Sequence, residues 1–188
     1  MRYKDFIIRQ IKEWLSELDK EQQDFHPFLC FGVLPEDFIN NSSCTFNIEA
    51  GITCSFKCNK ECGREVCQNS ILNENPIIAT SVERLVDMYN NSISDSITMQ
   101  GLEPLDSIGQ VLWFIRIFRE KSNDPIYIWT GYTEEECEAL VSLIKEFGWK
   151  NIIIKYGRYI PDSKGRYDEV VGVYLASDNQ YAIKYNGE

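Results

Sequence analysis

Four cysteines are crowded into one short stretch of the chain, GITCSFKCNKECGREVCQN, which spans residues 51–69. They are Cys54, Cys58, Cys62 and Cys67. Thiolates at this density bind zinc or an iron–sulfur cluster, unless the cysteines pair as disulfides. The stretch therefore predicts either a metal site or a disulfide cluster, and the choice between them largely decides the function.

The rest of the sequence favours metal over disulfides. The first residues, MRYKDFIIRQIKEWLSELDKEQQ, carry charges throughout and lack the continuous apolar core of a secretory signal. We therefore expect a cytoplasmic protein in a reducing compartment, where clustered thiols bind metal more often than they pair. The total of seven cysteines is odd, which fits poorly with a fully bridged secreted scaffold.

The four cysteines are spaced C-x3-C, C-x3-C and C-x4-C. Structural zinc sites prefer paired C-x2-C motifs from two places in the chain, and this stretch contains none. Three thiolates from one loop fit a cluster that has one iron left open for a substrate. The alternative is a zinc- or cluster-binding module without catalysis, in the zinc case with all four cysteines as ligands. The other cysteines are expected to be core thiols: Cys30, Cys44 and Cys137.

Charge and composition argue against some classes of partner. The 188-residue chain has a formal net charge of −10, which argues against general binding to nucleic acid or to an acidic membrane. No run of about 18 apolar residues occurs, so no membrane-spanning helix is expected. The length and the 44% of hydrophobic residues are those of one ordinary globular domain.

Strands and helices are predicted to alternate along the chain. Strand patterns occur at 44–50, 76–79, 96–100, 125–130, 151–156, 170–175 and 180–185. Helical patterns occur at 80–89, 107–121 and 133–147, and the last begins with a capping box, Thr133 with Glu136. An amphipathic helix is predicted within residues 1–23, followed by a connecting loop at 24–43.

This alternation implies βαβ units and a mainly parallel sheet, so the fold class is α/β, with one main domain at 44–185. Ligands of such sheets bind at the carboxyl ends of the strands. The cysteine stretch, Gly101–Pro104 (GLEP) and Thr130–Tyr132 (TGY) each follow a predicted strand. We therefore expect these three segments to meet at one edge of the sheet.

The motifs together resemble the radical S-adenosylmethionine enzymes. Within that family they are most similar to the activating proteins of anaerobic ribonucleotide reductase. The resemblance covers roughly residues 46–183 and is carried by ITCSFKC…VCQN, QGLEPL and WTGYTEEE. It implies a partial, open (βα) barrel of mainly parallel strands.

The family's cysteine loop has the spacing C-x3-C-x2-C, and Cys54 and Cys58 match its first two cysteines. Cys67 matches the third, because it follows apolar Val66 and precedes Gln-Asn. The last spacer then has eight residues, the main departure from the family. Cys62 is the alternative third ligand.

The resemblance also implies a set of residues that bind S-adenosylmethionine. GLEP matches a GGEP motif whose backbone and acid hold the methionine amino group, with Leu102 in place of the second glycine. The implied binding residues are Val66, Gln100, Gly101, Leu102, Glu103, Thr130 and Gly131. Lys155 departs from the family's acidic pattern, so it inherits no role, and Ser177–Gln180 resembles the family's closing S-x-N-Q turn.

The implied function is reductive cleavage of S-adenosylmethionine by a 4Fe–4S cluster. The resulting 5′-deoxyadenosyl radical takes a hydrogen atom from a glycine of a partner such as anaerobic ribonucleotide reductase. An electron donor such as a flavodoxin or ferredoxin is also implied. The cofactor carries the chemistry, so no catalytic residue is predicted beyond the cofactor site. A diverged radical enzyme that acts on another peptide is a further alternative.

Overall fold

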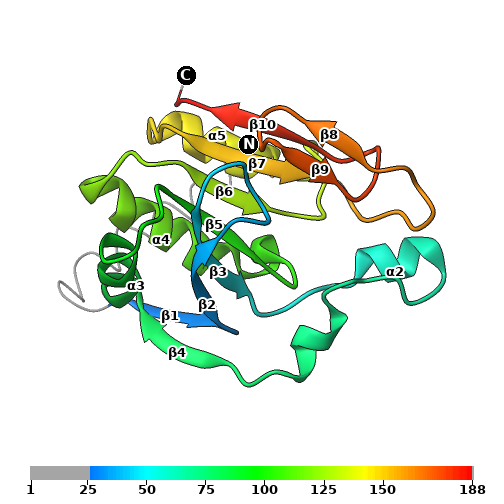
Figure 1. The fold of residues 1–188 in the computed structure, drawn as a ribbon, viewed down its shortest axis with the longest axis horizontal. Coiled ribbons are helices and arrows are strands. Elements are labelled where there is room, and N and C mark those ends of the chain that lie inside the picture. Colours follow the sequence, from blue (N-terminus) through cyan, green and yellow to red (C-terminus); the bar gives the residue numbers. More distant parts are fainter. Residues whose placement is uncertain (1–25, 188) are drawn as a thin grey trace, which may run out of the picture.

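The computed structural model describes residues 26–187, and the helix predicted within 1–23 lies outside this range. The centre is an open six-stranded sheet of order β10-β7-β6-β5-β3-β2 (Figure 1). Its strands are β2 (Val33–Asp37), β3 (Thr45–Gly51), β5 (Ser96–Gly101), β6 (Ile126–Trp129), β7 (Ile152–Tyr156) and β10 (Tyr181–Tyr185). The four inner strands run parallel, and the two edge strands, β2 and β10, run antiparallel to their neighbours.

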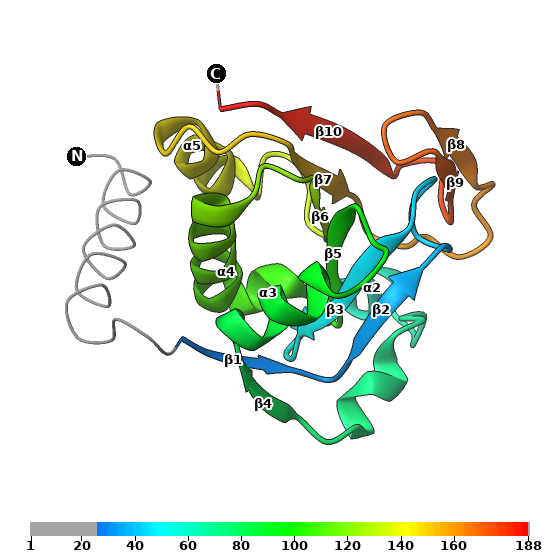
Figure 2. The same ribbon diagram turned by 60° about the vertical axis from the view of Figure 1, so that its left-hand side comes forward.

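Three helices cover one face of this sheet: α3 (Val82–Asn90), α4 (Ile108–Lys121) and α5 (Glu138–Glu146) (Figure 2). A short hairpin of β8 (Arg166–Asp168) and β9 (Val173–Leu175) contributes to a smaller apolar cluster on the other face. In β7, Ile152 and Ile154 join the core under the helices, whereas Ile153 joins the smaller cluster. This alternation is what the two-residue period of a strand requires when both faces are covered.

The crossover helix α4 supplies much of the main core. Its buried residues are Val111, Leu112, Trp113, Phe114, Ile115, Ile117 and Phe118. The Phe114 ring stacks on Phe118 with centroids 5.8 Å apart and meets Phe28 edge-on at 5.7 Å. No helix in the described part of the chain combines the length and apolarity needed to cross a membrane.

The mainly parallel α/β sheet and its principal helices are confirmed. Ser81 caps α3 by accepting a hydrogen bond from the backbone N–H of Arg84, at 3.2 Å. Both hydrogen bonds of the predicted capping box form, because Thr133 N donates to Glu136 and Glu136 N donates to the Thr133 hydroxyl. They lie on a turn before the helix, since α5 begins at Glu138 and not at the predicted residue 133. The sheet does not close into a barrel, since its order ends at β10 and β2 without pairing between them.

Two local predictions are wrong. Residues 24–43 are more than a connecting loop, because they contain β1 (Pro27–Cys30) and β2. Strand β1 forms a separate two-stranded sheet with β4 (Ile78–Ser81). The strand predicted at 170–175 shortens to β9, which pairs with β8 and stays outside the central sheet. Both misses concern very short strands, whose pairing in the tertiary structure outweighs the local pattern.

We expect the core around α4 to dominate the stability of the fold. Phe114→Ala removes a fully buried ring and should lower the free energy of unfolding by about 3–5 kcal/mol. Phe38→Ala is the matched control, because this phenylalanine is 64% exposed and its loss should cost at most about 0.5 kcal/mol. Urea denaturation followed by circular dichroism measures both, and equal losses in the two variants would contradict the assignment of the core.

Candidate functional site

The segments that follow β3, β5 and β6 meet at the carboxyl edge of the sheet, as the sequence predicts. Together with the end of β7 they line a cavity of about 180 Å³. Among its lining residues are Cys54, Cys58, Cys67, Glu103, Gly131 and Lys155, and we call it the cysteine cavity. Of the predicted binding residues, Gln100–Glu103, Thr130 and Gly131 all line it, whereas Val66 does not.

Two glycines bring the GLEP segment against the chain that leads to the cysteines. A Cβ on Gly51 would lie 2.6 Å from the backbone nitrogen of Glu103, and Gly101 has a left-handed φ of +118°. Two backbone hydrogen bonds stabilise this contact. Leu102 N donates to Gly51 O at 2.8 Å, and Glu103 N donates to Thr53 O at 3.2 Å. Side chains at these two positions would separate the acid from the thiols.

Leu102 fits the backbone at the position where the GGEP motif has its second glycine. Among the described residues Leu102 is not one of those with positive φ, so its Cβ meets no backbone penalty there. The side chain is only 8% exposed. The conformational demand for glycine in this motif is met by Gly101.

The expanded spacer folds into a short helix, α2 (Lys57–Cys62), and then returns to the cavity. The side-chain oxygen of Asn59 accepts hydrogen bonds from Val66 N at 2.9 Å and from Cys67 N at 3.0 Å. Asn69 then donates to Gly101 O at 2.7 Å, which ties the end of the stretch to β5. Asn59, at the start of the eight-residue spacer, thus binds the backbone at its end, and Cys67 lines the same cavity as Cys54 and Cys58.

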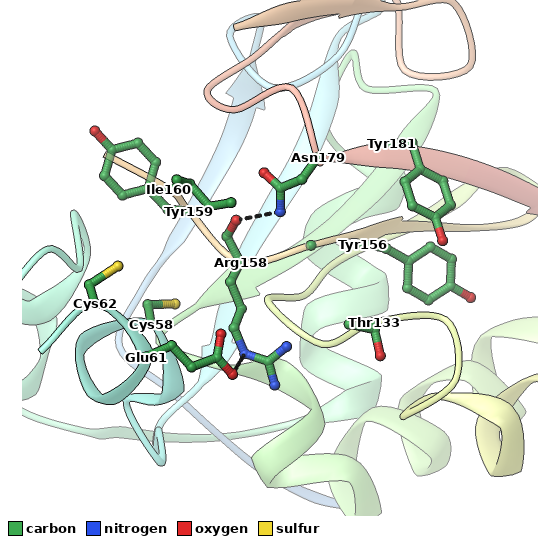
Figure 3. Close-up of a pocket in the computed structure, with 11 residues that line it drawn as sticks. Cys58, Glu61, Cys62, Thr133, Tyr156, Arg158, Tyr159, Ile160, Asn179 and Tyr181 are labelled. Carbon is green, nitrogen blue, oxygen red and sulfur yellow. Dashed lines mark hydrogen bonds and ion pairs between the residues drawn. The ribbon is translucent and has the colours of Figure 1, made fainter. Parts of the chain in front are cut away.

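Cys62 lines a different, neighbouring cavity of about 500 Å³ (Figure 3). Cys58 lines both cavities, as do Gly157 and Tyr159. Cys54 and Cys67 line the cysteine cavity but not this second one. Cys62 thus shares a cavity with Cys58 but not with Cys54 or Cys67.

The Glu103 carboxylate is buried and held in one orientation. One oxygen accepts hydrogen bonds from the Thr130 hydroxyl at 2.7 Å and Leu105 N at 3.0 Å. The other accepts from Gly131 N at 2.8 Å. Burial raises the pKa of Glu103, and these hydrogen bonds oppose the rise. A carboxylate fixed in this way is suited to a cationic group such as an ammonium, which forms charge-assisted hydrogen bonds.

Two thiols of the cavity, Cys54 and Cys58, are weak acids while they carry no metal. Burial raises the pKa of Cys54 to about 11, although Phe56 N donates to its sulfur at 3.2 Å. Burial also raises the pKa of Cys58. A positively charged metal centre would bring both to the thiolate form, so binding of metal here releases protons.

An ion-pair cluster fixes α2 against the loops that follow β6 and β7. Arg158 donates to both oxygens of Glu136, at 2.7 and 2.9 Å, and its Nε lies 3.0 Å from Glu61 on α2. Lys57 also donates to Glu136, at 2.7 Å, and its Nζ lies 4.2 Å from the ring centroid of Tyr132. The ion pairs of Lys57, Glu61 and Arg158 were not predicted, and Glu136 was predicted only as part of the capping box.

The chain belongs to an iron–sulfur family. A family model described as a 4Fe-4S single cluster domain matches residues 50–172, which is more than half of the chain. This membership agrees with the cysteine stretch and with the cavity that the stretch lines. No curated protein and no solved structure gives a significant match to the chain.

The side chains of the cavity fit such a cluster. Three thiols on the wall of one cavity are the soft ligands that iron–sulfur clusters take. Within residues 26–187, no three His, Cys, Asp or Glu side chains converge tightly enough to hold a single metal ion. A 4Fe–4S cluster takes its thiolates at different iron atoms, so its ligands need not converge on one point.

The ion-pair cluster should make stability depend on pH. Burial acts to raise the pKa of Glu136, but hydrogen bonds from Arg158 and Lys57 outweigh it and lower the pKa to about 2. The folded-state pKa lies below the unfolded value of about 4.3, so the stabilisation is full above that pH and is lost as pH falls toward 2. Because Glu136 is partly exposed, Glu136→Gln should cost only about 0.5–1 kcal/mol at neutral pH.

The measurement is urea denaturation of the wild type and Glu136→Gln at neutral pH and at about pH 3. The difference in the free energy of unfolding should narrow at the lower pH. Glu135→Gln is the control, because Glu135 is exposed and forms no ion pair with the residues that the structure describes. A difference that stays constant, or that widens in acid, would show that the ion pairs do not lower this pKa.

Proposed function

We propose that this protein holds a 4Fe–4S cluster in the cysteine cavity and uses it to cleave S-adenosylmethionine reductively. The observation that carries the proposal is that Cys54, Cys58 and Cys67 line one cavity with the buried carboxylate of Glu103. Membership of the 4Fe-4S family supports the cluster. Support for S-adenosylmethionine comes from Glu103, its neighbours and the resemblance of the motifs.

Cys54, Cys58 and Cys67 are the proposed ligands, because these three thiols line the cysteine cavity and the fourth thiol, Cys62, does not. Three protein ligands leave one iron available to a substrate. When bound, such a cluster supplies the electron that breaks a carbon–sulfur bond of S-adenosylmethionine, giving methionine and a 5′-deoxyadenosyl radical. The chain's own residues bind and orient the substrate and exclude water.

The carboxylate of Glu103 is the proposed binding group for the amino group of S-adenosylmethionine. Thr130 and Gly131 orient this carboxylate from β6, and the β5 end, Gln100–Leu102, forms the adjoining wall. A charge-assisted hydrogen bond to a buried carboxylate gives both affinity and a fixed pose. The fixed pose keeps the sulfonium at a constant position relative to the cluster ligands.

The sheet is also compatible with the partial, open (βα) barrel of radical S-adenosylmethionine enzymes, since its inner strands are parallel and its loops gather at the carboxyl edge. By the resemblance of its motifs to activating proteins, we propose that the radical is passed to a glycine of a protein partner such as anaerobic ribonucleotide reductase. The proposed electron donor is a flavodoxin or ferredoxin, and the proposed location is the cytoplasm.

Single cysteine variants test the ligand set. Cys54→Ala, Cys58→Ala and Cys67→Ala should each lose most of the iron and sulfide after anaerobic reconstitution, because each removes a thiolate ligand. Cys62→Ala is the matched control from the same stretch and should keep the wild-type content. Loss of iron in Cys62→Ala together with its retention in Cys67→Ala would reverse the assignment, and one zinc without iron or sulfide would overturn the cluster.

The second test is formation of 5′-deoxyadenosine by the reduced, reconstituted protein. Glu103→Gln removes the charge that faces the amino group, a loss of about 1.5–3 kcal/mol, so S-adenosylmethionine should bind at least about tenfold more weakly. Iron content should stay at the wild-type level, which separates substrate binding from cluster assembly. A fully loaded wild-type protein that makes no 5′-deoxyadenosine would rule out the cleavage reaction.

A further inference from the structure

A buried cation lies on the wall of the cysteine cavity and has no role in the function proposed above. Lys155, in β7, is only 7% exposed. Among the described residues it is the only lysine or arginine that lines the cavity. The cavity therefore combines three thiols, one buried acid and one buried base.

No carboxylate neutralises Lys155 directly. Its Nζ donates a hydrogen bond to Gly157 O at 3.2 Å and lies 5.5 Å from the ring centroid of Trp129. In the part of the chain that the structure describes, no acidic oxygen lies within 4.0 Å of it. The buried acid of the same cavity, Glu103, uses both of its oxygens for other donors.

Burying an ammonium with no carboxylate at ion-pair distance is unfavourable, so a negative group bound in the cavity would stabilise Lys155. Burial lowers the pKa of Lys155 to about 8, while Glu103 and Cys58 oppose this shift, so the ammonium form still predominates at neutral pH. The three thiolates of a bound cluster would place negative charge in the cavity that Lys155 lines together with Cys58. Lys155 and the cluster ligands are thus complementary in charge.

We infer that Lys155 is the counter-charge of the cluster and raises its reduction potential. Reduction adds one electron, supplied by an external one-electron donor, and makes the cluster more negative. A fixed positive charge in a cavity of low dielectric constant stabilises this reduced state more than the oxidised one. The inference rests on the cluster-binding part of the proposed function and does not depend on cleavage of S-adenosylmethionine.

The test is an anaerobic redox titration of the reconstituted full chain, with the reduced cluster followed by electron paramagnetic resonance. Lys155→Met should make one-electron reduction about tenfold less favourable, which is a potential about 59 mV more negative. Lys155→Arg keeps the charge and should stay close to the wild type. Lys121→Met is the control for net charge, because Lys121 is exposed in the last turn of α4.

The variants also separate charge from shape. An unchanged potential in a fully loaded Lys155→Met protein overturns the inference. Lys155→Gln serves as a second neutral variant if the methionine variant does not fold. Loss of iron in both neutral variants but not in Lys155→Arg supports the need for a positive charge, whereas loss in all three shows that the shape of lysine matters and overturns it.

The same experiment distinguishes this inference from the proposed function. Iron analysis of the wild type comes first, and a wild type without a cluster overturns both. A wild-type protein that holds a cluster but makes no 5′-deoxyadenosine contradicts only the proposed cleavage of S-adenosylmethionine. In that case the shift in potential of Lys155→Met still decides the role of Lys155.

Discussion

The site depends on a backbone contact between the ends of β3 and β5. Gly51 and Gly101 lack a Cβ, and a Cβ on Gly101 would lie 2.9 Å from Gly51 O, too close for any real side chain. Because these two parallel strands are neighbours in the sheet, their following segments leave the same edge side by side. The path of the backbone therefore brings the thiols and the Glu103 carboxylate into one cavity, and no interaction between these groups is needed for it.

The cysteine stretch beyond this contact is held by polar groups. Helix α2 has no buried residue, so hydrophobic burial contributes little to its position. Asn59 and Asn69 fix the backbone, and Arg158 and Lys57 fix the helix through Glu136. Partly exposed ion pairs are weakened by salt and are individually weak. The loop that carries the thiols is thus more sensitive to ionic conditions than the core beneath it.

The elements with a clear period could be predicted from the sequence, and so could the edge at which the motifs meet. That Cys67, and not Cys62, lines the cysteine cavity could not be predicted from spacing, because it depends on the hydrogen bonds by which Asn59 holds the spacer. The small sheet of β1 and β4 depends on pairing across residues far apart in sequence. The sequence shows a lysine, Lys155, in an isoleucine-rich strand. Its burial could not be predicted, because it depends on the hairpin that covers this face of the sheet.

The acid and the base of the cavity stand on opposite sides of β6, because Glu103 follows β5, Lys155 belongs to β7, and the sheet order is β7-β6-β5. Thr130 and Gly131, which follow β6, bind Glu103, and Trp129 lies beside Lys155, its partner in register. Since the two charges form no ion pair, neither is cancelled by the other. Each remains available to a bound group of opposite sign, so the sheet order itself gives the cavity a cationic side and an anionic side. That division suits a negative cluster and an ammonium-bearing substrate held in one place.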